Sequence, residues 1–308
     1  MRRNDSASDT SFGVDATVSV GRNMLLAVPK KGRLNEQCMK LLDGAGIDFY
    51  RPNRLDVAEC TSLPITLVFL PAADIAKYVG EGNVDLGITG TDVVEESLVD
   101  VNNLLELGFG KCKLALQAPT ASNYVDASQL TGHRIVTSFP NLAKKFFDQF
   151  DTAERKTQIK FVSGSVEAAC GLGLADAVVD LVETGTTMRA AGLCVVSEIL
   201  STQAVLISSK SSKHDELISK VRKRFEGYIT STKFMLIQYN ISRGKLPEAV
   251  KITPGKRSPT VSSLEGDDED AVAVSALVSK NDTASLMDKL ESVGATDIML
   301  FALNNSRM

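Results

Sequence analysis

The strongest constraint on the fold is a repeated alternation between wholly apolar runs and segments with helical periodicity. Residues 24–28 read Met-Leu-Leu-Ala-Val, a run typical of a strand buried on both faces. Apolar residues then recur at helical spacing from Leu34 to Ala45. The alternation continues over 65–98 and resumes over 134–207. It predicts an α/β fold of two lobes, each a doubly wound parallel sheet with helices on its faces.

The positions of these elements follow from the pattern. We expect strands at 24–28, 65–70, 84–90, 113–117, 134–137, 159–162, 193–196 and 204–207, and another in the apolar run that starts at Asp176. We expect helices at 34–45, 71–79, 92–98, 141–150, 165–174 and 188–191. Hydroxyl and carboxylate side chains at helix starts predict the caps Thr91 or Asp92, and Ser165, while Thr184 or Thr186 would cap the last helix if the stretch before it is purely structural.

The chain after residue 230 follows a different order. An amphipathic helix at 214–228 precedes strands and helices in the order β-α-β-β-α-β, which is the ferredoxin-like motif. The expected organisation is a polar, disordered leader (1–23), a first lobe of the periplasmic-binding-protein type (24–116 and 197–229), a second such lobe (117–196) and a ferredoxin-like regulatory domain (230–308).

Composition excludes several classes of protein. The net charge of −4 and the absence of tryptophan argue against nucleic-acid binding. No apolar run approaches the roughly 18 residues of a membrane helix, and the leader lacks the apolar region of a secretory signal. Five scattered cysteines without a C-x-x-C pair suggest reduced thiols in a cytoplasmic protein. His133 and His214 are not at metal-ligand spacing.

The stretch Asp176–Met188 carries the clearest chemical signal. An apolar strand that ends in a Gly/Thr turn before a helix directs free N–H groups and the helix dipole at one point, which suits a phosphate. Acidic residues just before such a turn suit sugar hydroxyls or a metal, so the stretch suggests a phosphosugar site. A buried strand followed by an ordinary capped helix is the alternative.

A second candidate site follows the first strand. Lys30, Lys31 and Arg33 lie in a Gly-containing turn at the carboxyl end of a buried strand, where open α/β sheets bind ligands. A solvated basic turn explains the same residues. The cleft between the two lobes is the expected ligand site.

These stretches resemble the ATP phosphoribosyltransferase family, the first enzymes of histidine biosynthesis. Glu167, Gly173, Ala175, Val178, Asp180, Leu181, Thr184, Gly185, Thr187 and Met188 stand at the spacing of that family's signature. Residues 28–34, 84–90 and 252–260 are also similar to the family, and the last of these marks its long form with a regulatory domain. Residues 61–65 and 69–75 look most like fungal members, and the resemblance extends from about residue 24 to the C-terminus.

The resemblance implies an activity. Adenine N1 of ATP attacks ribose C1 of phosphoribosyl pyrophosphate (PRPP), and pyrophosphate leaves. It also implies a need for Mg²⁺, inhibition by histidine at the tail domain, and homo-oligomers from dimer to hexamer.

The resemblance assigns roles to individual residues. Residues 183–187 (Glu183, Thr184, Gly185, Thr186, Thr187) would hold the 5′-phosphate. Asp180 would contact the ribose hydroxyls and Mg²⁺, and Lys31 and Arg33 would stabilise the leaving pyrophosphate. Arg54, Thr89 and Gly90 are candidate contacts for ATP, and Thr253, Ser258 and Thr260 are candidate contacts for histidine. An ordinary structural role explains these residues equally well. Glu167 fits a helix-start carboxylate better than a substrate contact.

Two other functions remain open at this level. A solute-binding module without chemistry would have similar lobes, although the lack of a secretion signal counts against it. A regulatory relative with weak catalysis would keep the tail domain, but no catalytic motif is missing.

Overall fold

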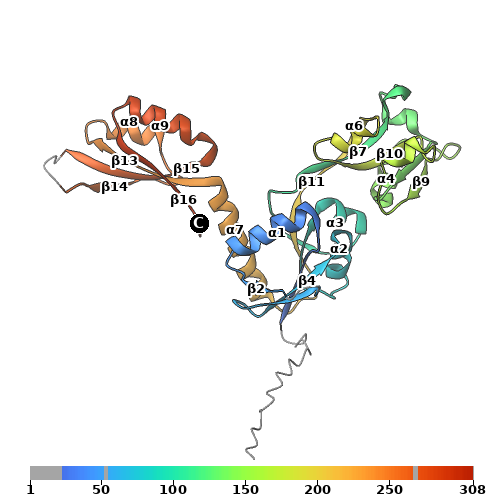
Figure 1. Ribbon diagram of the computed structural model, residues 1–308, viewed down its shortest axis with the longest axis horizontal. Coiled ribbons are helices and arrows are strands. Elements are labelled where there is room, and N and C mark those ends of the chain that lie inside the picture. The colour runs from blue at the N-terminus through green and yellow to red at the C-terminus, as the bar shows by residue number, and fades with distance from the viewer. Residues whose placement is uncertain (1–22, 52–54, 266–269, 308) are drawn as a thin grey trace, which may run out of the picture.

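The computed structural model describes residues 23–51, 55–265 and 270–307 (Figure 1). The first lobe contains a seven-stranded sheet in the order β2-β3-β4-β1-β5-β12-β6. Its strands are β1 (Met24–Pro29), β2 (Phe49–Tyr50), β3 (Val57–Cys60), β4 (Ile65–Leu70), β5 (Leu86–Gly90), β6 (Asn102–Glu106) and β12 (Ala204–Ser208). Its helices are α1 (Gly32–Gly44), α2 (Ala72–Gly80) and α3 (Thr91–Ser97).

The first sheet is mixed rather than parallel throughout. The central strands β4, β1 and β5 are parallel, as expected, and their side chains are buried almost continuously. The outer pairs are antiparallel, and the sequence pattern did not indicate β2, β3 or β6. These strands are short or half-exposed at the sheet edge, so they lack a continuous apolar run.

The second lobe contains a five-stranded sheet in the order β11-β7-β10-β8-β9. Strands β10, β8 and β9 are parallel, whereas β7 runs antiparallel to both β10 and β11. The strands are β7 (Cys112–Pro119), β8 (Arg134–Thr137), β9 (Gln158–Phe161), β10 (Ala177–Val182) and β11 (Leu193–Thr202). The helices are α4 (Pro140–Phe147), α5 (Ala168–Gly171) and α6 (Thr186–Ala190), with 3₁₀ turns at Thr120–Ser122 and Ala127–Leu130.

The chain passes between the two lobes at residues 107–111 and at Gln203. Strands β7 and β11 therefore carry the second sheet beyond residues 117–196 on both sides. The three sheets have separate apolar clusters, with the first centred on β1 and β4, the second on β7 and β10, and the third on β13 and β15.

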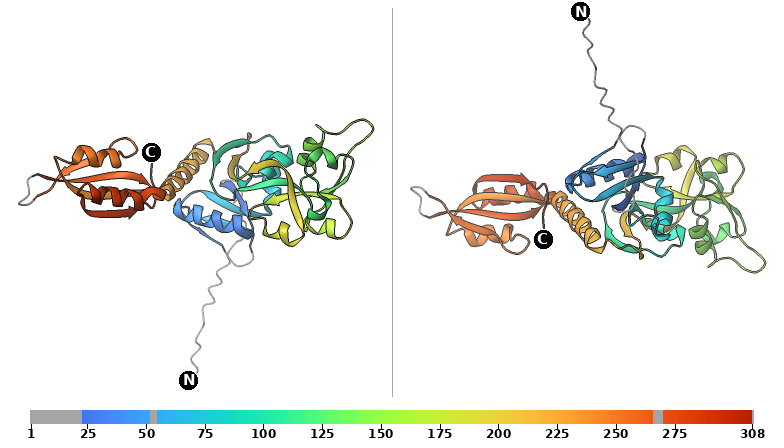
Figure 2. Two further views of the ribbon diagram at one scale, coloured as in Figure 1. Left: turned by 90° about the horizontal axis from the view of Figure 1, so that it is seen from above. Right: turned by 90° about the horizontal axis from the view of Figure 1, so that it is seen from below.

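The tail domain has the expected ferredoxin-like topology. Its antiparallel sheet has the order β14-β15-β13-β16, and both helices cover one face (Figures 1 and 2). The strands are β13 (Phe234–Ser242), β14 (Thr260–Ser263), β15 (Ala271–Ser279) and β16 (Thr296–Ala302), and the helices are α8 (Leu246–Ile252) and α9 (Thr283–Ser292), with a 3₁₀ turn at Lys280–Asp282.

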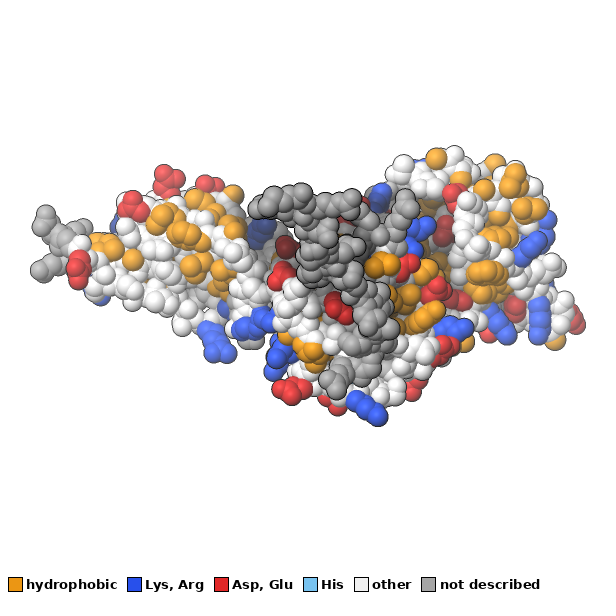
Figure 3. Space-filling model, turned by 60° about the horizontal axis from the view of Figure 1, so that its bottom comes forward, with side chains coloured by type: hydrophobic (Ala, Val, Ile, Leu, Met, Phe, Trp, Pro, Cys, Tyr) orange, Lys and Arg blue, Asp and Glu red, His pale blue; other side chains and the backbone are white. Residues whose placement is uncertain are grey.

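Helix α7 (Asp215–Lys233) connects the first lobe to the tail. Ile218, Val221 and Phe225 lie on its buried face in the core of the first lobe. In the view of Figure 3, several Lys and Arg side chains lie on the surface between the tail domain and the first lobe. Among the described residues, no helix is both long and apolar enough to cross a membrane.

The predicted helix caps are wrong in all three cases. Gly90 precedes α3, and the side chains of Thr91 and Asp92 bond to Thr202 instead. Helix α5 begins after Glu167 and ends at Gly171, so Ser165 does not cap it and the helix is shorter than 165–174. Gly185 precedes α6, and no side chain caps that helix.

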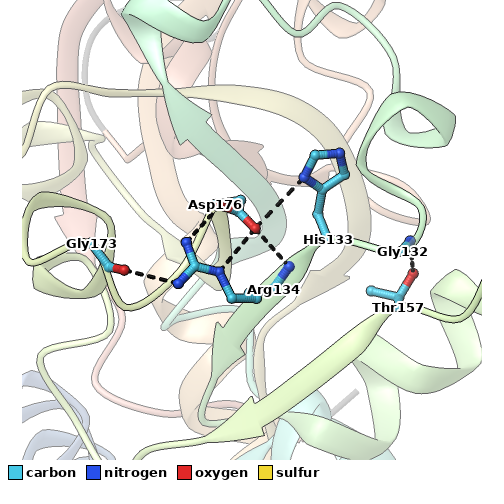
Figure 4. Close-up of polar contacts among 6 residues, drawn as sticks. All are labelled: Gly132, His133, Arg134, Thr157, Gly173 and Asp176. Atoms are coloured by element: carbon cyan, nitrogen blue, oxygen red, sulfur yellow. Dashed lines mark hydrogen bonds and ion pairs between the residues drawn. The ribbon is translucent and has the colours of Figure 1, made fainter.

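A polar network joins the amino-terminal ends of β8 and β10 (Figure 4). Asp176 accepts hydrogen bonds from the Arg134 backbone N–H (2.9 Å), Nε (3.2 Å) and Nη2 (2.8 Å), and Arg134 Nη1 donates to the Gly173 carbonyl (3.0 Å). His133 Nδ1 lies 3.6 Å from the same carboxylate. The side-chain bonds from Arg134, followed by its backbone bond, lower the pKa of Asp176 to about 2. Asp176 lies at the end of β10 opposite residues 183–187, so we assign it a structural role.

This network predicts a pH-dependent stability. Because the folded pKa of Asp176 lies below the ordinary value of about 3.9, its contribution is present at neutral pH and is lost as the pH falls from about 4 towards 2. Asp176→Asn should lower the free energy of unfolding at pH 7 by about 1 kcal/mol, since the carboxylate is partly exposed. Urea denaturation of both proteins between pH 7 and pH 3 checks this. A difference that does not shrink with acid would contradict the assignment.

Candidate active site

Two strand ends face each other between the lobes. The turn after β1 carries Arg33, and the loop after β10 carries Glu183. Arg33 Nη1 lies 2.6 Å from Glu183 Oε2, although 150 residues separate them in the chain. These side chains are 78% and 52% exposed, so the ion pair holds the lobes together only weakly. The ion pair matters because it brings together the basic turn after β1 and the 183–187 loop, the two candidate sites found in the sequence.

The loop 183–187 has the form of an anion-binding turn. Gly185 adopts a left-handed conformation with φ of 71° and directly precedes α6. The Thr184 and Thr186 hydroxyls lie 3.0 Å apart, and Arg189 Nη2 donates to the Thr184 carbonyl (3.0 Å). A Cβ atom on residue 185 would lie 2.7 Å from Arg189 Nη1, so glycine allows the arginine to fold back against the loop. Thr186 and Thr187 are exposed in the first turn of the helix.

Asp180 lies on β10, three residues before the loop. Its Oδ1 accepts from the Leu181 N–H (2.8 Å), and its carbonyl accepts from Gln117 Nε2 (3.1 Å). Burial raises the pKa of Asp180, and the nearby Glu167 carboxylate raises it further. The residue that precedes the candidate phosphate loop is therefore a partly buried carboxylate close to a second one.

The three cations of the basic turn after β1 have different environments. Lys30 Nζ pairs with Asp56 (2.6 Å), so this lysine is engaged within its own lobe. Lys31 immediately precedes α1 and is exposed, and Gly32 supplies the left-handed turn with φ of 82°. Arg33 pairs with Glu183 of the other lobe, and Lys31 lies two residues before it in the chain.

The predicted nucleotide contacts have a different environment. Thr89 is fully buried and its hydroxyl donates to the Ala72 carbonyl (3.0 Å), so its side chain faces α2. Gly90 lies against Asp92, where a Cβ atom would be 2.1 Å from Asp92 Oδ1. Arg54 lies outside the described residues.

Thr202 makes contacts with the residues that follow Gly90, and the sequence did not indicate these contacts. Thr202 Oγ1 donates to Asp92 Oδ1 (2.6 Å) and accepts from the Asp92 N–H (3.1 Å) and from Thr91 Oγ1 (2.8 Å). These bonds fix the end of β11, the last strand of the second sheet, to the start of α3 in the first lobe. Threonine and aspartate 110 positions apart give no local signal that they would meet.

Glu96 makes a second connection that the sequence did not reveal. Its Oε1 accepts from the Asn141 N–H and its Oε2 from the Leu142 N–H, both at 2.9 Å, while Asn141 Nδ2 donates to the Glu96 carbonyl (2.8 Å). A carboxylate from the first lobe thus satisfies the free N–H groups at the start of α4 in the second lobe.

A hollow of about 520 Å³ adjoins Thr91, Thr202 and Glu183. Its lining comes from α3, the crossing segment, β10 and β11, and comprises Thr91, Glu95, Glu106, Lys111, Cys112, Lys113, Val182, Glu183 and residues 200–203. Burial, followed by Asp92 and Glu183, raises the pKa of Cys112 to about 11, so its thiol is protonated at neutral pH and is not a nucleophile.

The candidate histidine contacts lie in the tail domain. Thr253 is fully buried, and its hydroxyl lies 2.8 Å from the Tyr239 hydroxyl and donates to the Ala249 carbonyl (3.2 Å). Ser258 and Thr260 are exposed. A hollow of about 390 Å³ adjoins this segment and is lined by residues including Pro254, Gly255, Lys256, Asp282, Ser285 and Lys289.

The described residues contain no group of three or more His, Cys, Asp or Glu side chains suited to a metal ion. Mg²⁺ in phosphoryl sites commonly uses one or two carboxylates, with substrate oxygens and water completing the shell. Asp180 beside the loop fits that kind of site, in which most of the ligands come from the substrate.

Comparison with known proteins finds matches over most of the chain. The family profile "ATP phosphoribosyltransferase" matches residues 71–227, and that of the family's C-terminal domain matches residues 231–305. The chain is 50% identical to the ATP phosphoribosyltransferase of Yarrowia lipolytica over 96% of its own length and 100% of the relative. It is 51% identical to that of Saccharomyces cerevisiae, over 92% and 97% respectively.

A solved structure is also similar. It is the "ATP phosphoribosyl transferase (HisG:HisZ) complex from Thermotoga maritima", with a TM-score of 0.56 and 26% identity over 66% of this chain and 98% of that one. The two family profiles together match most of the chain, and the two fungal relatives share about half of their residues with it over nearly their whole length. The chain therefore belongs to the ATP phosphoribosyltransferase family.

Proposed function

We propose that this chain transfers the 5-phosphoribosyl group of PRPP to N1 of ATP, releasing pyrophosphate. The observation that carries the proposal is the meeting of the 183–187 loop with the basic turn after β1, through Arg33 and Glu183 at 2.6 Å. A site with a phosphate loop in one lobe and cations in the other suits a substrate that has phosphate at both ends of a sugar. The product is that of the first step of histidine biosynthesis.

Each part of the proposed site has its own role in the reaction. The N–H groups and hydroxyls at 184–187 hold the 5′-phosphate, and Asp180 holds the ribose hydroxyls. As adenine N1 forms its bond to ribose C1, the bond from C1 to the pyrophosphate oxygen breaks. Lys31 and Arg33 stabilise the negative charge that collects on the departing pyrophosphate.

Binding and orientation account for most of the catalysis in this proposal. Adenine N1 is itself the nucleophile, so the protein needs no covalent nucleophile, in keeping with the protonated Cys112 thiol. Mg²⁺ would be held by Asp180 and the pyrophosphate oxygens, and it would add positive charge at the leaving group. For the nucleotide side we retain Arg54, Thr89 and Gly90, with Thr89 acting through its backbone because its hydroxyl is engaged.

We further propose that the tail domain binds histidine as a feedback inhibitor and that the enzyme works in the cytoplasm as a homo-oligomer. A free amino acid needs a carboxylate for its ammonium group and a cation for its carboxylate. Asp282 and Lys289 supply both at the hollow beside residues 254–256, with Ser258 and Thr260 on the same connecting segment. Thr253 supports this segment from the core, through its bonds to Tyr239 and Ala249.

The reaction itself provides the first test. The full-length protein with ATP, PRPP, Mg²⁺ and a pyrophosphatase should form an N1-ribosylated ATP, detected by its ultraviolet spectrum and mass. Asp180→Asn should lower kcat by about 100-fold or more, because the ribose loses a charged hydrogen-bond acceptor. Asp176→Asn, at the other end of the same strand, is the matched control and should retain kcat. If PRPP and ATP both bind but no adduct forms, the proposal is wrong.

The phosphate loop provides a second test. Gly185 and Gly192 flank α6 with the same φ of 71°, but a Cβ atom would meet the Arg189 side chain only at residue 185. Alanine at either position should cost roughly 1 kcal/mol of stability through backbone strain. Only Gly185→Ala should weaken PRPP binding, by about 10-fold or more, because the loop must move away from Arg189. Calorimetric titration with PRPP measures this, and equal losses in both variants would argue against a phosphate site here.

Histidine binding provides a third test. Titration of the full-length protein with histidine should show binding, and Asp282→Asn should weaken it by about 10-fold, because the ligand's ammonium group loses its carboxylate partner. Asp288→Asn, which alters an exposed carboxylate on α9, the helix that follows Asp282, should leave the affinity unchanged. Unchanged affinity in Asp282→Asn would place the histidine site elsewhere.

A further inference from the structure

We propose that the last residues of the chain link the tail domain to the active site through α1, and that Asn305 is a positioning residue in this link. Residues 303–307, here called the C-terminal strap, follow β16 and return to the first lobe. The regulatory meaning of the strap depends on the proposed inhibition by histidine. Its physical basis is a set of contacts that stand independently of it.

The strap is fixed to α7 along its backbone. The Ser306 N–H and hydroxyl donate to the Gly227 carbonyl at 3.2 and 3.3 Å. The Asn304 carbonyl accepts from the Ser231 hydroxyl at 3.2 Å. Since Gly227 and Ser231 are one helical turn apart and both buried, the strap lies along one face of α7.

Asn305 carries the contact beyond α7 to α1. Its Nδ2 donates to the carbonyl of Gly44, the last residue of α1, at 2.9 Å. Arg307 Nη1 donates to Asn305 Oδ1 and to the Ser306 carbonyl, which orients the amide with its N–H group towards α1. This bond joins residues 261 positions apart in the chain.

Two helical glycines allow these segments to approach so closely. A Cβ atom on residue 227 would lie 2.1 Å from the Ser306 carbonyl oxygen, and one on residue 44 would lie 2.0 Å from the Tyr228 ring. Glycine inside a helix costs about 0.5–1 kcal/mol relative to alanine. Here its use is explained by the packing of the strap on α7 and of α7 on α1.

Helix α1 connects this junction to the active site. Its 13 residues give a rod of about 20 Å, buried along Cys38, Leu41 and Leu42. Lys31 precedes its first turn, and Arg33 in that turn reaches Glu183 of the second lobe. A displacement at Gly44 would therefore be transmitted along the helix to the cations assigned to the pyrophosphate.

The tail sheet is thus attached to the first lobe at two points. Helix α7 ends at Lys233 and β13 begins at Phe234, without a linker, while the strap leaves β16, the neighbour of β13 in the sheet. A rotation of the sheet about the first point must pull the strap along or break its bond to Gly44. A hollow of about 490 Å³ at this junction, lined by residues that include Gly44, Tyr228 and Asn304, leaves room for such a rotation.

The test compares Asn305→Ala with Asn304→Ala in the full-length enzyme. Asn305→Ala removes the bond to Gly44, whereas Asn304 contributes only its backbone carbonyl and serves as the matched control. In Asn305→Ala the activity that remains at saturating histidine should rise at least ~5-fold, the low end of typical allosteric coupling. The kcat and KM without histidine should change less than about twofold, as should histidine affinity. Unchanged inhibition in Asn305→Ala would overturn the proposal.

A second variant disturbs the strap through its contact with α7 instead of its contact with α1. Alanine in a helix normally adds stability relative to glycine, by about 1 kcal/mol. Gly227→Ala should instead expel the strap and reproduce the loss of inhibition, because its Cβ atom would meet Ser306. Retained inhibition in this variant would also overturn the proposal.

Hydrogen exchange decides the mechanical link without histidine. Asn305→Ala should speed amide exchange several-fold both near Gly44 and at residues 31–35, at the far end of α1. A change confined to the strap and Gly44 would show that α1 does not transmit the contact. A wild-type enzyme that histidine does not inhibit would refute the regulatory proposal, whereas the exchange experiment would still decide the role of the strap.

Discussion

The burial of β10 determines where the chemically important residues of the second lobe lie. Ala177, Val178 and Val179 are fully buried, and β10 lies between β7 and β8 in the middle of the sheet. With a buried strand fixed in register on both sides, Asp180 must emerge at the rim and residues 183–187 must form the loop beyond it. The position of the candidate phosphate site is thus a consequence of core packing, and the loop itself contributes little to stability.

The contacts between the lobes differ in kind from the contacts within them. Inside each lobe, apolar side chains are packed in clusters that belong to that lobe alone. Between the lobes lie the Arg33–Glu183 ion pair, the Glu96 carboxylate at the start of α4, and the Thr202–Asp92 bonds. Polar contacts of this type can be exchanged for contacts with a ligand or water at small net cost, whereas a buried apolar cluster cannot. The arrangement suits a cleft that must open for two substrates.

The sequence predicted those parts of the molecule that depend on local pattern. Buried parallel strands such as β1, β4 and β8 appear as apolar runs, and the ferredoxin-like order follows from the pattern of the tail. The cap prediction for α3 was wrong because the Thr91 and Asp92 side chains bond to Thr202, 110 or more residues away, which periodicity does not encode. Glu96 and Asn305 were missed for the same reason. Thr253 was a candidate histidine contact, yet the fold buries its side chain against Tyr239.

The Arg33–Glu183 pair has a consequence for how salt acts on this enzyme. A cation that faces water is normally accompanied by dissolved anions, which are released when a phosphate binds and which make the affinity fall with ionic strength. Arg33 instead has a counter-ion that is covalently part of the chain. An anion that binds Arg33 displaces a tethered carboxylate, so this arginine adds less to the salt dependence of binding than its charge alone would suggest.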